Sequence, residues 1–385
     1  QSFGEYNKAL EYHEKHLAIA EKLDDQGGVG KAYCNIGNVY NSLGEYDKAL
    51  EYHQKDLEIA LLLGDQGNLG ETYCNVGIAW QFLGNYQEAL KHYEESLKIA
   101  TLLKDQRGEG RAYGNIGNAY QALGEYKQAL DYHQKDLEIA KRLGLQGSEG
   151  KAYCNIGITY RSLQKYQKAL ESHKKSLRIA LRLGDQGSEG RAYSGIGNVH
   201  QSLGEYDKAL GYHQKDLEIA LSLGDQGGEG MAYRNIGSVY KALEEYNKAL
   251  EYHRKDLEIA LSLGNQGCVN EAYYSIEITY DSIGNAYQVA GKYQQAIEYY
   301  QKALVIAKYL EDQVGKEIAY SSIGNAYDFL KKYKKALEYH QKHLAIVLRL
   351  GNQDKAMAAY INLANTYQAL NDYEKAKDFY KKALA

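Results

Sequence analysis

The chain has 385 residues, of which 44% are hydrophobic and 25% are charged, an ordinary composition for a protein with a large buried core. Its formal net charge is −4, from 46 basic and 50 acidic side chains, which argues against nucleic acid as a partner. No stretch of roughly 18 apolar residues is present, so we expect no membrane insertion. The cysteines Cys34, Cys74, Cys154 and Cys268 lack zinc-ligand spacing, which favours reduced thiols in a cytoplasmic protein without metal or other cofactor.

An internal repeat runs through the whole chain. A tyrosine followed three residues later by alanine recurs at Tyr6, Tyr46, Tyr86, Tyr126, Tyr166, Tyr206, Tyr246, Tyr293, Tyr333 and Tyr373. The spacing is 40 residues at every step except one of 47 residues, between Tyr246 and Tyr293. Such self-similarity is typical of proteins in which each repeat packs against its neighbours.

Each repeat is predicted to form two helices, as the third repeat illustrates. Apolar and small residues in 110–124 follow the i, i+3, i+4 spacing of a helix, and Gly124 is expected to end it in a left-handed conformation. A second amphipathic stretch, 125–144, ends at Gly144. The small residues Gly117 and Ala129 are expected at close helix contacts, where a larger side chain would overpack.

These residues resemble the tetratricopeptide repeat (TPR). The TPR pattern corresponds here to Tyr113, Ile116, Gly117, Tyr120, Gly124, Tyr126, Ala129 and His133. Two features depart from it: the repeat has 40 residues rather than 34, and residues such as Leu61 or Lys141 replace the helix-ending proline. The long repeat and the strings "GRAYGNIG" and "GEYDKAL" are most similar to the TPR domain of the Pins/LGN spindle-orientation adaptors.

The expected fold is therefore all-α, a right-handed α-solenoid (superhelix) of helix-turn-helix TPR units in a single domain, 1–385. An unpaired second helix, 5–23, comes first. Nine helix pairs follow at 30–63, 70–103, 110–143, 150–183, 190–223, 230–263, 270–310, 316–350 and 356–385. Neither end of the sequence carries a polar capping helix, so we expect a fragment of a longer protein.

The pair at 270–310 contains seven additional residues, near 277–283. Seven residues are nearly two helical turns, so they can lengthen the first helix of the pair without rotating its apolar face. Two interpretations stay open for this insertion: a specialised docking point, and neutral slippage between repeats.

Three patterns that resemble catalytic or ligand-binding chemistry are interpreted as structural. His-x-x-Asp recurs as His53/Asp56, His133/Asp136, His213/Asp216 and His253/Asp256, whereas a catalytic pair is needed only once. The "GDQGGEG" loop lacks a Gly-Lys-Ser/Thr ending, and Asp225 is expected to cap the next helix with Glu229 in its first turn. Gly114 and Ser194 replace cysteine in sibling repeats, and nothing activates the thiols. We do not expect an enzyme.

Function is instead expected on the inner, concave face, which the first helices line. Its candidate residues are amide and basic side chains at a fixed helical phase: Lys31, Asn38, Arg111, Asn118, Gln121, Lys151, Arg161, Arg191, Asn198, Gln201, Asn285, Asn325 and Asn365. An asparagine can both donate to and accept from a main-chain peptide group, which suits an extended peptide. The resemblance to Pins/LGN implies the same, because an asparagine-lined groove of that family grips extended segments of partner proteins.

The sequence thus predicts a non-catalytic protein-interaction scaffold that binds an extended, acidic segment of a protein partner. The alternative is an architectural spacer, or a subunit that self-associates end to end into fibres without a peptide ligand. A regulatory array attached to an enzyme domain elsewhere in a longer protein is a third interpretation.

Overall fold

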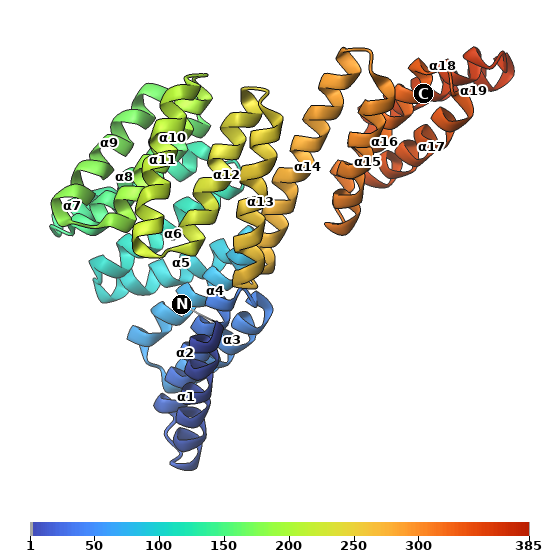
Figure 1. The fold of residues 1–385 in the computed structure, drawn as a ribbon. Helices are drawn as coiled ribbons and strands as arrows, with labels where there is room; N and C mark the ends of the chain where they lie inside the picture. The colour runs from blue at the N-terminus through green and yellow to red at the C-terminus, as the bar shows by residue number, and fades with distance from the viewer. Residues whose placement is uncertain (1–2, 385) are drawn as a thin grey trace. The chain divides into compact units, whose positions relative to one another are not determined.

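The structure is a computed structural model that describes residues 3–384, in which the chain forms nineteen α-helices and no strand (Figure 1). The helices are α1 (Phe3–Lys22), α2 (Gln26–Leu43), α3 (Tyr46–Leu63), α4 (Gln66–Phe82), α5 (Tyr86–Leu103), α6 (Gln106–Ala122), α7 (Tyr126–Arg142), α8 (Gln146–Ser162), α9 (Tyr166–Leu183), α10 (Gln186–Ser202), α11 (Tyr206–Leu223), α12 (Gln226–Ala242), α13 (Tyr246–Leu263), α14 (Gln266–Val289), α15 (Tyr293–Tyr309), α16 (Gln313–Phe329), α17 (Tyr333–Leu350), α18 (Gln353–Ala369) and α19 (Tyr373–Leu384). The all-α solenoid of helix pairs is confirmed.

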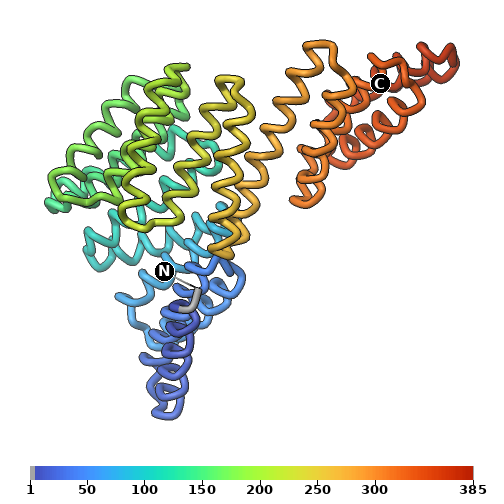
Figure 2. The backbone as a smooth tube through the Cα atoms, viewed as in Figure 1, coloured from blue at the N-terminus to red at the C-terminus, as the bar shows by residue number. Residues whose placement is uncertain are grey.

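Two compact units make up the molecule. The first compact unit comprises Gln1–Asn235 and Ile259–Gln266, and the second comprises Ile236–Glu258 and Gly267–Ala385. Within each unit, consecutive helices run in alternating directions and are joined by tight turns (Figure 2). None of the helices in the described part of the chain is both long and apolar enough to cross a membrane.

Aspartates start most of the first helices, and they do so about four residues before the predicted boundaries. Asp25 accepts a hydrogen bond from the backbone N–H of Gly28 at 3.0 Å, so α2 begins at Gln26 rather than near residue 30. Asp225 accepts from Gly228 in the same way, at 3.0 Å, which confirms the predicted cap of α12. The two glycines that follow each of these aspartates lie within the helix, whereas the sequence analysis expected a loop there.

Left-handed glycines end the helices where the sequence predicted them. Gly124 has φ +77° and Gly144 has φ +67°, which are backbone conformations that other residues adopt only with strain. The backbone N–H of Gly124 donates to the carbonyl of Gln121 at 3.2 Å, which satisfies one of the last carbonyl groups of α6.

The two helices of a repeat pack against each other where a glycine of the first helix contacts the ring of a histidine or tyrosine of the second. In the third repeat, a methyl group at Gly117 would stand 2.6 Å from Cε1 of His133, so no larger residue fits without displacing the ring. Ala129 is fully buried beside it. Burial lowers the pKa of His133 to about 4, so the ring is neutral at pH 7. Gly117 and Ala129 are therefore close contacts, as predicted, and the His133 ring fills the space beside Gly117.

Helix α14 contains the insertion. It has 24 residues against 17 in α12, a difference that equals the seven additional residues, and it is one continuous helix. Ile276 and Ile283, which lie seven residues apart, are both buried, so the apolar face is preserved along the helix. The predicted lengthening of the first helix is confirmed.

Candidate functional site

Two adjoining hollows lie on the first compact unit, and Asn155 lines both. The Asp136 hollow has a volume of about 710 Å³ and is lined by α6, α7, α8 and the turn before α8. The Asp216 hollow has a volume of about 420 Å³ and is lined by α8, α10, α11 and the start of α12. The first helices of three repeats thus contribute to one continuous row of polar side chains.

The Asp136 hollow contains three of the predicted residues. Arg111 and Asn118 come from α6, and Lys151 comes from α8. Arg111 and Lys151 are exposed and Asn118 is half-buried. The Arg111 guanidinium lies 3.7 Å from Glu71, a loose pair between side chains about half exposed, which leaves its other N–H groups available.

The Asp216 hollow contains two more of the predicted residues, Arg191 and Asn198 on α10. The Arg191 guanidinium donates to Ser188 Oγ at 3.1 Å. Leu223 and Met231 add an apolar wall. Cation, amide and apolar surface therefore lie side by side, which is a combination that suits a peptide rather than a simple ion.

Sequence reasoning missed the aspartates that give these hollows their floor. Asp136 and Asp216 were interpreted only as members of structural His-x-x-Asp pairs, yet each lines a hollow. Burial raises the pKa of Asp136 to about 6 and the pKa of Asp216 to about 7. One signal was in the sequence: this position alternates along the chain as Asp56, Ser96, Asp136, Ser176 and Asp216.

Five predicted residues of the first compact unit lie outside the two hollows. Lys31 and Asn38 are exposed on α2, and the Asn38 amide lies 3.8 Å from Cys34 Sγ of its own helix. The Gln121 amide donates to Ser162 Oγ of the next repeat at 2.9 Å, so it joins two repeats. Arg161 is half-buried, and burial lowers its pKa. Gln201 is half-buried in the last turn of α10.

The remaining three predicted residues belong to the second compact unit. Asn325 and Asn365 line a hollow of about 430 Å³ together with Asp328. Tyrosine hydroxyls already occupy two of the amide oxygens, since Tyr300 donates to Asn285 at 2.7 Å and Tyr380 donates to Asn365 at 2.5 Å. The asparagines of this unit are therefore partly used within the fold.

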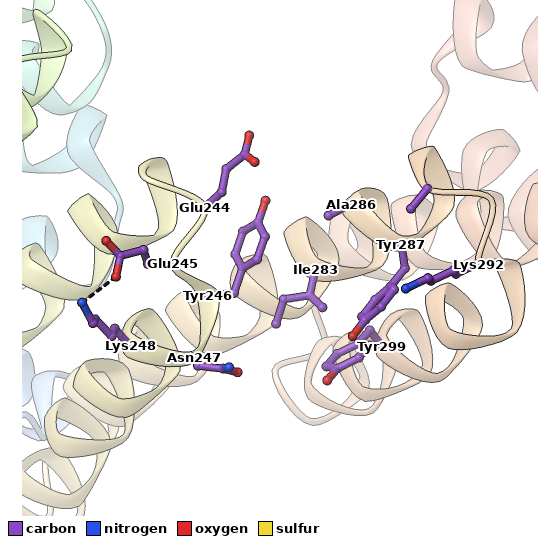
Figure 3. A pocket seen from close by; sticks show the side chains of 11 residues that line it. Glu244, Glu245, Tyr246, Asn247, Lys248, Ile283, Ala286, Tyr287, Lys292 and Tyr299 are labelled. Atoms are coloured by element: carbon purple, nitrogen blue, oxygen red, sulfur yellow. Dashed lines mark ion pairs between the residues drawn. The ribbon is translucent and has the colours of Figure 1, made fainter.

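A further hollow of the second compact unit, of about 540 Å³, lies beside the inserted residues (Figure 3). Tyr246 stands on one side and Ile283 of α14 on the other, and Tyr287 stacks on Tyr299 with ring centroids 5.5 Å apart. One interpretation of the insertion near 277–283 was a specialised docking point, and Ile283 of the lengthened helix α14 lines this hollow. Three tyrosines line it together with charged side chains, which are Glu244, Glu245, Lys248 and Lys292.

The cysteine and histidine side chains have properties opposite to those of catalytic groups. Burial raises the pKa of the Cys34 thiol to about 11 and also raises that of Cys74, so the reactive thiolate is disfavoured. The buried rings of His53 and His213 have pKa values lowered to about 4. Among residues 3–384, no group of three or more His, Cys, Asp or Glu side chains is arranged to hold a metal ion.

Stacked helix pairs with a polar groove define a helical-repeat protein of the solenoid class. The sequence matches the tetratricopeptide repeat family over residues 1–61, 28–102, 108–182, 188–262, 275–349 and 317–385. The chain belongs to the tetratricopeptide repeat family. No curated protein matches it significantly.

Solved structures of three other proteins show the same fold. A Rap protein in complex with competence and sporulation factor is 15% identical, with a TM-score of 0.53 over 90% of this chain and 99% of that one. The apo form of the quorum sensor NprR from B. thuringiensis is 16% identical, with a TM-score of 0.52 over 95% of this chain and 99% of that one. A signal transduction ATPase with numerous domains and a tetratricopeptide repeat sensor, from Pyrococcus horikoshii, is 19% identical with a TM-score of 0.56. That match covers 91% of this chain and 55% of the ATPase chain.

Proposed function

We propose that the chain is a non-catalytic scaffold that binds an extended segment of a partner protein along the Asp136 and Asp216 hollows. The observation that carries this proposal is the shared Asn155, because it joins the predicted pair Arg111 and Asn118 to the equivalent pair Arg191 and Asn198. Amide side chains two repeats apart can hold separate peptide groups of one extended chain without demanding particular side chains.

The charges at the mouth of the hollows favour acidic side chains in that segment. Arg107, Arg111 and Lys151 outnumber Asp105 among the exposed charges around the Asp136 hollow, whereas Arg191 and Asp225 are the exposed charges of the Asp216 hollow. Guanidinium groups bind carboxylates through paired, charge-assisted hydrogen bonds. We expect such contacts to set the rate of association and the register of the segment more than its affinity.

Similarity to other proteins supports the same function. Tetratricopeptide repeat proteins typically act as protein-interaction scaffolds, and the Rap protein of the same fold was crystallised with competence and sporulation factor. The sequence resemblance to Pins/LGN adaptors points to an asparagine-lined groove and to a role in cortical or signalling complexes. Cys34, Cys74 and Cys154 are free thiols, which fits action in the cytoplasm.

Selection of random linear peptides displayed on phage tests this function. The wild-type chain should enrich binders, and changing Asn118, Asn198 and Arg191 together to alanine should weaken them about a hundredfold, the sum of several lost hydrogen bonds. Asn38→Ala is the control, because Asn38 belongs to the same series of asparagines but lies outside both hollows. Unchanged affinity in the triple variant would rule out these hollows.

Self-association is the second candidate, and exposed leucines favour it. Leu62 is 74% exposed and Leu102 is 73% exposed, both in the extra turn that the 40-residue repeat adds to the second helix. Such a row could join copies into an architectural fibre. Light scattering over a range of concentrations tests this alternative, since a mass that stays at one chain would exclude it.

A further inference from the structure

The third repeat and the turn that follows it each depart from their siblings at one position, and both positions line the Asp136 hollow. Gly114 stands where other repeats carry Cys34, Cys74, Cys154 or Ser194. Leu145 stands where other repeats carry a capping aspartate such as Asp105, and it makes no side-chain cap. Both changes remove polar atoms: Gly114 leaves space, and Leu145 leaves apolar surface.

The loss of a side chain at position 114 leaves an amide without its usual acceptor. In three other places, an asparagine donates to the residue 41 positions earlier: Asn75 to Cys34 Sγ at 3.4 Å, Asn115 to Cys74 Sγ at 3.1 Å, and Asn235 to Ser194 Oγ at 3.0 Å. The equivalent acceptor for Asn155 would be residue 114, which is glycine. Within the described residues, the Asn155 amide forms no side-chain hydrogen bond, and it faces the hollow.

The same glycine opens the hollow to the carboxylate of Asp136. A methyl group at Gly114 would stand 3.2 Å from Oδ2 of Asp136, and one at Gly110 would stand 3.4 Å from Oδ1. Asp56, at the same position of the first repeat, accepts from Thr72 Oγ1 at 3.0 Å. Asp136 accepts no hydrogen bond from any residue in the described part of the chain. Burial raises its pKa to about 6, as expected for a carboxylate without a partner.

We propose that the Asp136 hollow receives a basic side chain, Lys or Arg, of the segment that the scaffold binds. The cationic end would donate to the Asp136 carboxylate, while its aliphatic stem packs on Ile139 and Leu145. The Asn155 amide would donate to a carbonyl of the same segment. Arg111 and Lys151, at the mouth, would pair with acidic residues on either side of the basic one. This inference rests on the proposed function and adds the side chain that the groove recognises.

Sibling residues supply the test variants. Gly114→Ser fills the hollow with the residue of the fifth repeat and gives Asn155 its acceptor. Asp136→Ser installs the residue of Ser96 and Ser176, which donate to carbonyls across the helix pair at 2.7 and 2.8 Å. Cys34→Ser is the matched control, since it changes the same repeat position away from both hollows. All three substitutions occur naturally elsewhere in the chain, so the variants should fold, which thermal unfolding followed by circular dichroism verifies.

The experiment is a selection of random linear peptides displayed on phage, carried out in parallel on the wild-type chain and on the three variants. Wild type and Cys34→Ser should enrich a basic residue with acidic neighbours, whereas Gly114→Ser and Asp136→Ser should lose the basic residue. Replacing that residue by Nε-acetyl-lysine in a selected peptide should weaken binding to the wild type about tenfold, as measured by fluorescence polarisation.

Two failures are distinguishable. Peptides that lose affinity in the Asn118, Asn198 and Arg191 triple variant, but carry no basic residue or bind Gly114→Ser equally well, would overturn this inference and leave the scaffold function standing. A wild-type chain that enriches no peptide at all would overturn both.

Discussion

Polar contacts between neighbouring helices are mostly neutral in the first compact unit and partly ionic in the second. In the first, Asn75 donates to Cys34 and Asn115 to Cys74. In the second, the buried carboxylate of Glu317 lies 3.2 Å from His343 Nε2 and also pairs with Lys355. His340, at the position of His133, lies 2.8 Å from Asp328.

The difference shows which polar contacts can recur in near-identical repeats and which cannot. A neutral pair can be copied from repeat to repeat, because it costs little to bury and does not repel its copies. A buried charge needs a particular partner, and it is strongly destabilising once that partner is lost. Ionic contacts therefore require repeats that have diverged, and the second compact unit should respond to the removal of a charged partner more than the first.

Removing the Glu317 carboxylate should have the largest effect. Glu317 is 5% exposed and bonded to two partners, so Glu317→Ala should lower the free energy of unfolding by about 3 kcal/mol at pH 7. Urea unfolding followed by circular dichroism measures this loss. Glu338→Gln is the control, because its pair with Lys342 is exposed and should contribute little to stability. Equal effects of the two changes would remove the contrast between buried and surface pairs.

Overpacking the neutral contact in the first compact unit should come next. Gly117→Val would push a methyl against the buried His133 ring, at a cost of about 2 kcal/mol. Gly147→Ala is the matched helical control: its added methyl meets nothing within 4 Å, so the higher helix propensity of alanine should stabilise by about 0.5 kcal/mol. Melting temperatures of both variants test the pair. A Gly117→Val chain as stable as wild type would mean that the ring can move aside.

Part of the pH dependence of stability should come from Glu277 of α14. This side chain is 2% exposed, and burial, together with Asp312 and Asp281 nearby, raises its pKa from 4.5 to about 8. Between these values the folded chain keeps a proton that the unfolded chain releases, so the free energy of unfolding falls as pH rises. Glu277→Gln cannot ionise, so its advantage over wild type should grow from almost nothing at pH 4 to about 2 kcal/mol at pH 6, and it should keep growing up to pH 8.

Urea unfolding at several pH values measures this advantage. Glu298→Gln, at an exposed position on α15, should follow the wild-type curve throughout. A Glu277→Gln curve that runs parallel to wild type at all pH values would show that Glu277 is ionised in the folded chain at pH 7.

The repeat pattern predicted the elements of this fold well, because each of them is encoded locally. Helix pairing, the ends at Gly124 and Gly144, and the cap by Asp225 depend on residues within a few positions of one another. The boundaries at 30, 70 and 110 were too late, since helical phase does not reveal that an aspartate has already begun the helix.

The candidate site was predicted less completely. The helical phase of a residue predicts which way its side chain points, but it does not predict which neighbouring side chains are long enough to contact it. Arg111 and Asn118 do line a hollow, whereas Gln121, at the same phase, reaches Ser162 of the next repeat. The Asp136 hollow could not be foreseen from residues that are present, since it arises from the side chain missing at Gly114. The hollow becomes evident only from the contacts between residues 41 positions apart, which the third and fourth repeats lack.

The smallest expected effect is the loss of one neutral contact. Asn115→Ala removes the hydrogen bond to Cys74 Sγ, a weak acceptor, and should cost about 0.5 kcal/mol. Asn155→Ala is the matched control, because Asn155 has no such acceptor in the described residues, and it should cost less in stability while weakening peptide binding. Thermal unfolding and fluorescence polarisation of the two variants separate these outcomes. If Asn155→Ala costs as much stability as Asn115→Ala, the Asn155 amide has a hydrogen-bond partner within the fold and is not available to bind a ligand.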